Sequence, residues 1–230
     1  MTTIPGNLQH VRERIATACQ RAGRGVEEVT LLAVSKTFGA DAVRAAAAAG
    51  QRAFGENYIQ EGVEKIAALR DLGLMWHCIG PIQSNKTRLV AEHFDWVHTV
   101  DRLKIAERLS AQRPADRPPL NVCIQVNIDG GANKSGVAPG DALALARAVA
   151  ALPQLKLRGL MSIPEIAPDF EAARAVHAGA RALFDQLNAD GLGLDTLSMG
   201  MSDDLEAAIA AGSTMVRIGT AIFGSRAPKP

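Results

Sequence analysis

Thr-Leu-Leu-Ala-Val-Ser-Lys occupies residues 30–36 and consists of an apolar run that ends in Lys36. An apolar run without polar alternation is typical of a strand covered on both faces, as in a parallel sheet. Lys36 is then at the carboxyl end of that strand, the edge at which barrels and open α/β sheets bind ligands. A lysine partly withdrawn from water there can attack a carbonyl carbon. The alternative is a solvated lysine in a strand-to-helix loop, because exposed lysines are common.

Short apolar runs and segments of helical period alternate along the whole chain of 230 residues. This alternation predicts repeated βαβ units, and eight of them make a (β/α)8 TIM barrel, which typically needs about 250 residues. A doubly wound sheet with fewer strands is the alternative, because the runs at 52–54 and 96–100 are weak. We expect one domain over residues 1–230. The predicted strands are 29–34, 52–54, 74–79, 96–100, 120–126, 156–161, 196–199 and 214–218.

Helices are predicted in the intervals and once more before the first strand, where Asn7 is the expected N-cap. Val11, Ile15 and Cys19 recur with helical spacing and predict the buried face of this extra N-terminal helix. The predicted helices are 7–22, 41–49, 58–69, 85–92, 101–111, 140–151, 169–188 and 203–211.

Charge and composition exclude several functional classes. The chain has 25 basic and 24 acidic side chains, a net charge of +1 and no Lys/Arg block, so we expect no nucleic-acid or membrane partner. Its three cysteines lack Cys-x-x-Cys spacing, and its histidines lack ligand spacing, so neither disulfides nor a metal site is predicted. The first residues lack the pattern of a signal peptide, and no apolar run approaches the ~20 residues of a membrane span. We expect a cytoplasmic protein.

Polar residues and glycines follow the last two predicted strands. Ser198 and Ser202 come at and after strand seven, and Gly219 and Thr220 follow strand eight. In barrels the loops after these two strands, with a helix N-terminus, commonly bind phosphate. The alternative is that Ser202 or Asp203 only caps a helix and the glycines only form turns.

Four cationic or titratable residues at strands or their ends remain open at this stage. Arg217 lies within an apolar run, where a charge is costly without a partner, so it either pairs with a carboxylate or faces a ligand at the barrel mouth. His77 is either a hydrogen-bonded core histidine or a functional group. Lys86 and Lys134 follow strands three and five, and each has a solvated-loop alternative.

Five separated motifs resemble those of one known family, the pyridoxal phosphate homeostasis proteins, also called proline synthase co-transcribed homologues. The resemblance covers nearly the whole chain. Its motifs are Ala-Val-Ser-Lys at 33–36, Phe-Gly-Glu-Asn-Tyr at 54–58, Trp-His-Cys-Ile-Gly at 76–80, Gly-Leu-Met-Ser-Ile-Pro at 159–164, and the pair Leu-Ser-Met-Gly-Met-Ser at 197–202 and Val-Arg-Ile-Gly-Thr-Ala-Ile-Phe-Gly at 216–224.

The resemblance implies a barrel like the N-terminal domain of alanine racemase, of pyridoxal phosphate (PLP) fold type III. It implies that Lys36 holds PLP as an aldimine and that Arg217 faces the pyridine nitrogen. Asn57 and His77 are implied to be near the cofactor. The residues implied to surround the phosphate are Ser198, Ser202, Gly219 and Thr220.

The resemblance also bears on what is done with the cofactor. Racemisation needs acid and base groups on both faces of the bound cofactor. The likeness to racemases implies that their second base is a tyrosine from an additional C-terminal domain, which we expect this chain to lack; Tyr58 is its one tyrosine. We therefore expect a monomeric PLP carrier acting in vitamin B6 homeostasis, with PLP-dependent apoenzymes as recipients. The alternatives are a weak PLP-dependent racemase or lyase, and a Schiff-base aldolase barrel acting on a sugar phosphate.

Overall fold

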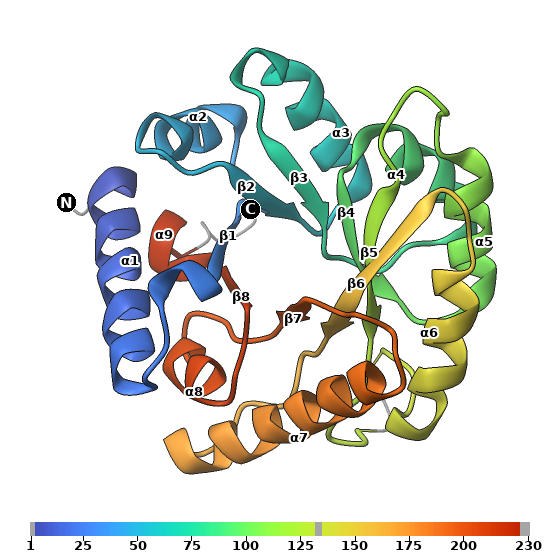
Figure 1. Cartoon of the computed structure of the whole chain (residues 1–230). Coiled ribbons are helices and arrows are strands. Elements are labelled where there is room, and N and C mark those ends of the chain that lie inside the picture. Colours follow the sequence, from blue (N-terminus) through green and yellow to red (C-terminus); the bar gives the residue numbers. More distant parts are fainter. Residues whose placement is uncertain (1–2, 132–134, 226–230) are drawn as a thin grey trace.

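The computed structural model describes residues 3–131 and 135–225. Within them eight parallel strands form a closed barrel in chain order, so the predicted TIM barrel is confirmed (Figure 1). β1 pairs with β8 as well as with β2, which excludes an open doubly wound sheet. The two weak runs both form strands of the barrel. The strands are β1 Thr30–Val34, β2 Ala53–Glu56, β3 Met75–Cys78, β4 Trp96–Val100, β5 Leu120–Gln125, β6 Leu155–Met161, β7 Thr196–Ser198 and β8 Met215–Ile218.

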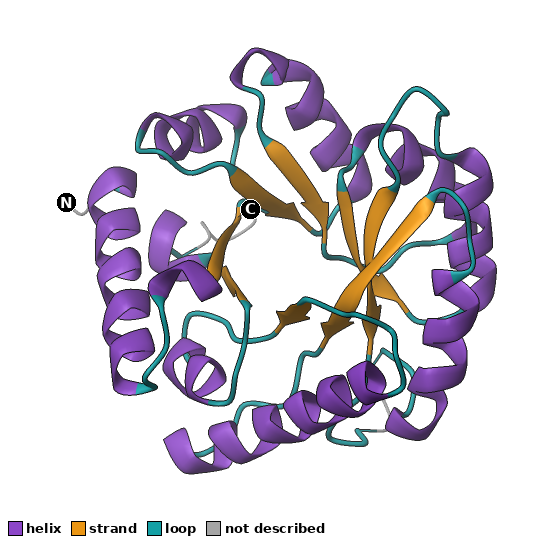
Figure 2. Ribbon diagram, viewed as in Figure 1, coloured by secondary structure: helices purple, strands orange, loops and turns teal. Residues whose placement is uncertain are grey.

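Helices surround the strands on the outside of the barrel (Figure 2). All eight predicted helices are present, and the short helix α9 after β8 was not predicted. The bounds are α1 Ile4–Arg21, α2 Ala40–Ala48, α3 Ile59–Ala68, α4 Thr87–His93, α5 Leu103–Gln112, α6 Ala142–Ala150, α7 Phe170–Ala189, α8 Leu205–Ala210 and α9 Thr220–Phe223. Among the described residues, no helix has the length and apolar character that crossing a membrane requires.

The N-terminal helix α1 begins earlier than its sequence suggested. Thr3 is the N-cap, because its hydroxyl accepts a hydrogen bond from the Gly6 amide, so the predicted capping role of Asn7 is wrong. The Asn7 side chain instead donates to the Ile222 carbonyl at 2.9 Å and fastens α1 to α9. The predicted apolar stripe of α1 is buried. This helix packs against α2, α8 and α9, beside the junction of β8 and β1 (Figure 1).

The two faces of β1 explain where Lys36 is placed. Side chains alternate across a strand. Ala33 joins the large apolar cluster between strands and helices, whereas Leu32 and Val34 belong to a separate cluster with Ile79 and Met215 inside the ring of strands. Lys36 comes two residues after Val34 and continues the inward face. The strand therefore carries the lysine to the mouth of the barrel.

Candidate functional site

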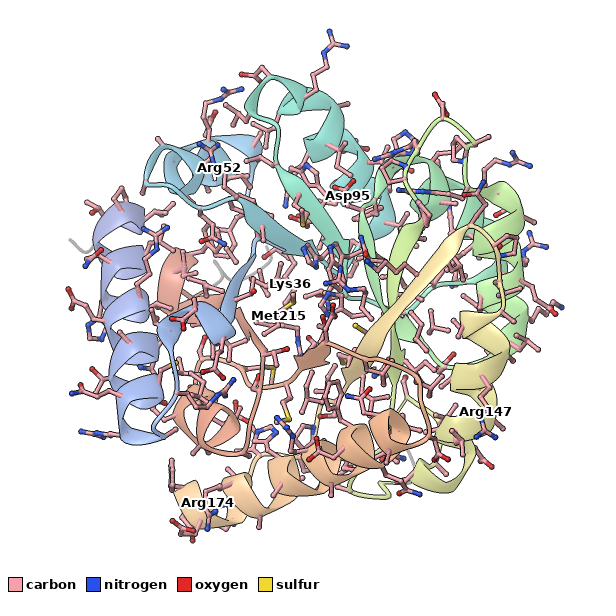
Figure 3. The ribbon with its side chains drawn as sticks, in the orientation of Figure 1. Lys36, Arg52, Asp95, Arg147, Arg174 and Met215 are labelled. Atoms are coloured by element: carbon pink, nitrogen blue, oxygen red, sulfur yellow. The ribbon has the colours of Figure 1, made fainter. Side chains whose placement is uncertain are left out.

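A cavity of about 210 Å³ opens where β1 and β8 end, bounded also by the loops after β2, β6 and β7. Figure 3 shows Lys36 within the ring of strands, whereas Arg147 and Arg174 lie on the outer helices α6 and α7. Six of the eight predicted cofactor residues line this cavity; His77 and Ser198 are buried behind it. The six are Lys36, Asn57, Ser202, Arg217, Gly219 and Thr220.

A larger neighbouring cavity, of about 290 Å³, lies between the β6–α7 loop and α8. It shares Met201 and Asp203 with the first cavity, but its described lining contains carboxylates and apolar groups and neither lysine nor arginine. The smaller cavity is therefore the candidate site, because it combines an amine, a guanidinium and hydroxyl groups. Lys86 does not line it, and Lys134 falls outside the described residues.

The backbone before Lys36 is fixed by a buried charged cluster on the outer side of β1 and β2. The Ser35 hydroxyl donates to Glu56 Oε1 at 2.5 Å, and Lys65 Nζ donates to the same oxygen at 2.8 Å. Lys65 Nζ also donates to the Ser35 carbonyl at 2.7 Å. Burial raises the pKa of Glu56, while the hydrogen bonds from Lys65 and Ser35 act in the opposite direction. We call Ser35, Glu56 and Lys65 the Lys65 cluster.

The backbone after Lys36 is fixed from the same side. Thr37 has φ of 69°, and it is the one non-glycine residue with positive φ in the described chain. Its amide donates to Glu61 Oε1 at 2.6 Å, and Lys65 Nζ contacts that same oxygen at 2.6 Å. A threonine in the left-handed region is strained and persists only where its surroundings enforce it. Lys36 is thus a half-buried side chain on a backbone held at both neighbours.

Arg217 forms the opposite wall of the cavity. Its guanidinium donates to Ser198 Oγ at 2.8 Å and to the Ser162 carbonyl at 2.9 Å, and 5% of the residue is exposed. No carboxylate in residues 3–131 and 135–225 is within ion-pair distance of Arg217, although the Asp204 charge acts on it from further away, and Arg217 lines the cavity. Burial lowers the pKa of Arg217 to about 10, which leaves the group cationic at neutral pH.

Two histidines lie behind Arg217 in the interior of the barrel. His98 Nδ1 is 2.9 Å from Ser198 Oγ, and His98 Nε2 is 2.9 Å from His77 Nδ1. The His77 ring stacks on Trp96 with centroids 5.1 Å apart and is buried and hydrogen-bonded, as expected for a core histidine, and its predicted place near the cofactor stays a prediction. Burial lowers the pKa of His77 to about 3 and that of His98 well below its usual value. Sequence reasoning assigned no role to His98, although its spacing from Trp96 puts both on one face of β4.

The loops after β7 and β8 meet at the cavity, as the phosphate hypothesis requires. Ser202 Oγ accepts a hydrogen bond from the Ala221 amide at 3.4 Å, which joins the two loops. Gly200 has φ of +96°, and a Cβ there would be 2.5 Å from Ala208 Cβ, so the turn requires glycine. Helix α8 begins at Leu205 with Asp204 as its N-cap, which corrects the predicted start at residue 203.

Unsatisfied polar atoms at the site provide a test of whether an oxygen-rich cofactor fits. Asn57 Oδ1 is buried, lines the cavity and has no hydrogen-bond partner among the described residues. Ser162 Oγ, beside the carbonyl that Arg217 contacts, is likewise buried without one. Buried polar atoms are normally paired, so the Asn57 oxygen at the cavity indicates a polar ligand, whereas Ser162 does not line the cavity. An amine, a cation and an unpaired amide oxygen around one cavity fit a phosphorylated aldehyde such as PLP.

Metal chemistry has no comparable support. Among the described residues, no group of three or more His, Cys, Asp or Glu side chains is arranged to hold a metal ion. Cys19, Cys78 and Cys123 are buried free thiols.

Comparison with known proteins assigns the barrel to a family. The family model described as alanine racemase, N-terminal domain, matches residues 6–227. The pyridoxal phosphate homeostasis protein of Pseudomonas aeruginosa is 64% identical, over 98% of this chain and 97% of its own length. The protein of that name from Escherichia coli K12 is 58% identical over 98% of each chain. PipY of Synechococcus elongatus, solved with PLP bound, is 40% identical with a TM-score of 0.81, covering 93% of this chain and 100% of PipY. The chain belongs to the pyridoxal phosphate homeostasis protein family.

Proposed function

We propose that this protein binds PLP through Lys36 and acts in intracellular PLP homeostasis as a carrier of the cofactor. The observation that supports this most strongly is that half-buried Lys36 shares one cavity with buried Arg217. When bound, PLP supplies an aldehyde that condenses reversibly with a primary amine. Pinning of Ser35 and Thr37 reduces the conformational freedom that Lys36 would lose on bonding the cofactor.

The other groups of the cavity have distinct tasks in this proposal. Ser202, Gly219 and Thr220 hold the phosphate where the two last loops meet. Arg217 would lie beside the pyridine nitrogen and oppose its protonation, because two positive charges in a buried site repel. The ring is then a weak electron sink, which restrains C–H chemistry. Asn57 Oδ1, which has no hydrogen-bond partner among the described residues, would be available to accept a hydrogen bond from a cofactor hydroxyl.

Carrier function rather than turnover agrees with the distribution of acid and base groups. Tyr58 is 55% exposed and does not line the cavity, so the chain's one tyrosine is not placed to serve the cofactor. A carrier needs only exchange of one amine for another at the aldehyde carbon. We propose PLP-dependent apoenzymes as recipients, a cytoplasmic location and a monomeric state.

Absorbance spectroscopy of the purified protein tests the assignment of Lys36. Titration with PLP should produce a yellow species, and borohydride should abolish it and fix the cofactor on the peptide that contains Lys36. Lys36→Ala should prevent both effects. Lys86→Ala is the matched control, because Lys86 lies outside the cavity and should leave both unchanged. A protein that stays colourless, or a cofactor fixed on another lysine, would contradict the proposal.

Transfer measurements separate the carrier from an enzyme. The PLP-loaded protein should reactivate a PLP-dependent apoenzyme faster than free PLP does. The Lys36→Ala protein mixed with PLP should reactivate it no faster than free PLP alone. Incubation with L-alanine or L-serine should leave the amino acid chemically unchanged. Specific turnover that Lys36→Ala abolishes would favour the racemase or lyase.

A further inference from the structure

A continuous chain of hydrogen bonds runs from the cavity wall into the barrel interior. It passes from Arg217 to Ser198 at 2.8 Å, from Ser198 to His98 at 2.9 Å and from His98 to His77 at 2.9 Å. The four residues come from β8, β7, β4 and β3 and are at most 5% exposed. Beyond the chain, His77 Nε2 is buried without a partner among the described residues. We call these four residues the histidine chain.

Arg217 determines which way every proton in the histidine chain points. A guanidinium can only donate, so Ser198 Oγ must accept from it. Ser198 has one hydroxyl proton to donate, and His98 Nδ1 is its one acceptor within the described residues. If His98 Nδ1 accepts, its proton is on Nε2, which must donate to His77 Nδ1. His77 in turn carries its proton on Nε2.

The reverse direction is less favourable by simple counting. If His98 Nδ1 carried a proton, it would donate to Ser198 Oγ, and the buried hydroxyl proton of Ser198 would have no acceptor. The chain would then contain two unsatisfied groups, that proton and His77 Nε2, instead of one. Buried polar groups without partners are costly, so the direction set by Arg217 is the stable one.

We propose that His98 and His77 are positioning residues of the cofactor site: Arg217 locks both as neutral Nε2–H tautomers, and the locked chain holds the Ser198 hydroxyl and the guanidinium in place. This inference rests on the proposed function only where the cofactor is concerned. Ser198 thereby acts on the cofactor through Arg217 rather than by touching the phosphate.

The surroundings of His77 and His98 keep both imidazole rings neutral. The charged or titratable group facing His77 is His98, and those facing His98 are His77 and Arg217. Burial and the arginine both lower the pKa of His98, and burial lowers that of His77 to about 3. A proton on either ring would place a second positive charge beside Arg217. Because neither ring carries that extra proton, the Arg217 guanidinium is the sole full charge in the histidine chain.

Nitrogen-15 NMR of cofactor-free protein labelled at histidine tests the tautomers without PLP. Both His77 and His98 should show a protonated Nε2 and an unprotonated Nδ1, unchanged from about pH 8 to about pH 5. A protonated Nδ1 at His98, or an imidazolium at either residue in this range, would overturn the proposal. Assignment uses His77→Asn and His98→Asn, each of which removes one set of signals.

Arg217→Met tests whether the arginine sets the direction. Ser198 then loses its donor, and the fixed Nε2–H state of His98 should give way to a mixture of both tautomers. Arg44→Met is the matched control: Arg44 pairs with Asp71 on the exposed surface and should leave both spectra unchanged. Tautomers that stay fixed in Arg217→Met would refute the arginine's part.

Cofactor binding provides the functional readout. His98→Phe keeps an aromatic ring but removes the acceptor for Ser198, and it should weaken PLP binding by about tenfold, which corresponds to losing one good hydrogen bond. It should also make the absorbance of the bound cofactor depend on pH. His98→Asn retains an acceptor near the former Nδ1 and should restore most of the affinity. Equal binding by wild type and folded His98→Phe would refute the positioning role.

These outcomes are separable from failure of the proposed function. A protein that never binds PLP but shows both locked tautomers would remove the cofactor assignment and leave the chain intact. A protein that turns yellow with PLP but whose histidines are not locked as Nε2–H tautomers would support the cofactor assignment and refute the histidine chain. Thermal unfolding followed by circular dichroism identifies any variant that has not folded, and His77→Phe then replaces His98→Phe in the binding measurement.

Discussion

Two buried polar networks support the candidate site, and they differ in the charges of their members. The Lys65 cluster lies outside the barrel wall, between β1, β2 and α3, and pairs full charges at 2.8 Å. The histidine chain lies inside the barrel and contains one cation and three neutral groups. The first fixes the backbone that carries Lys36, and the second fixes the side chain of Arg217.

The difference follows from what each network faces. A carboxylate beside Arg217 would cancel the charge that opposes protonation of a ring nitrogen, so neutral partners suit the inside of the barrel. Glu56 is separated from the cavity by β1, and its charge is met by Lys65 on its own side of the sheet. Ion pairs therefore stabilise the outer side of the sheet, where they do not change the charge at the cavity. Inside the barrel, where an ion pair would change that charge, neutral hydrogen-bond partners hold Arg217.

Lys65→Met should give the largest effect, because it leaves Glu56 buried without its cation. Removing one partner of a buried ion pair typically costs about 3–5 kcal/mol of unfolding free energy. The folded-state pKa of Glu56, already raised, should rise further in the variant. A raised carboxyl pKa gives stability that is present at low pH and lost as pH rises, so the deficit should be smaller near pH 4 than at pH 7. Urea denaturation of wild type and Lys65→Met at pH 4 and pH 7 measures this deficit in unfolding free energy.

A double variant and a surface variant calibrate that result. Lys65→Met combined with Glu56→Gln removes both charges and should be less destabilised than Lys65→Met alone. Arg44→Met breaks the exposed pair with Asp71 and should cost less than about 1 kcal/mol. A Lys65→Met protein as stable as Arg44→Met would mean that the cluster contributes no more than a surface pair.

The histidine chain should reveal itself in the pH dependence of stability. The folded pKa of His77 is lowered to about 3, so in mild acid the unfolded chain binds a proton that the folded chain refuses. Stability is then fully present above the unfolded pKa and falls as pH falls, by up to about 1.4 kcal/mol per pH unit for one histidine. Between pH 7 and pH 5, His77→Phe should lose about 2 kcal/mol less than wild type.

Exposed His10 supplies the control for that measurement. His10 lies on the exposed face of α1. The unfolding free energy of His10→Phe should therefore change between pH 7 and pH 5 by about as much as that of wild type. If His77→Phe and wild type lose the same unfolding free energy between the two pH values, His77 is protonated in the folded protein and its imidazole is not neutral. The contrast between a network of paired charges and a cation with neutral partners would then fail.

Sequence patterns predicted the barrel well because strands buried on both faces leave continuous apolar runs, and even the weak runs at 52–54 and 96–100 became strands. Lys36 and Arg217 were predictable because each interrupts or ends such a run. Lys65 and His98 were not, because a lysine on an amphipathic helix and a histidine in a strand have ordinary solvated or core roles. Their roles become visible only in tertiary contacts: Lys65 contacts Glu56, 9 positions away, and His98 contacts Ser198, 100 positions away.

Residues near element ends were the other source of error. Asn7 and Thr3 are both good capping residues, and the sequence cannot tell which one the chain uses when both precede the same apolar stripe. The tertiary bond from Asn7 to Ile222 decides, and it requires the position of α9. The family resemblance implies that Ser198 is beside the phosphate, and that stays a prediction; in the structure Ser198 is buried and one hydrogen bond from Arg217, which lines the cavity. Its hydroxyl serves Arg217.

The smallest predicted effect concerns the strain that Glu61, an ion-pair partner of Lys65, enforces beside Lys36. Thr37 is held at φ of 69° by the bond from its amide to Glu61, and a β-branched residue is poorly suited to that region. Asn tolerates the left-handed conformation, so Thr37→Asn should raise the unfolding free energy by about 0.5–1 kcal/mol. In a protein that also carries Glu61→Gln the gain should shrink, because the backbone is then free to leave the strained region. A Thr37→Asn protein less stable than wild type would show that the threonine side chain, and not only its backbone, holds the segment after Lys36.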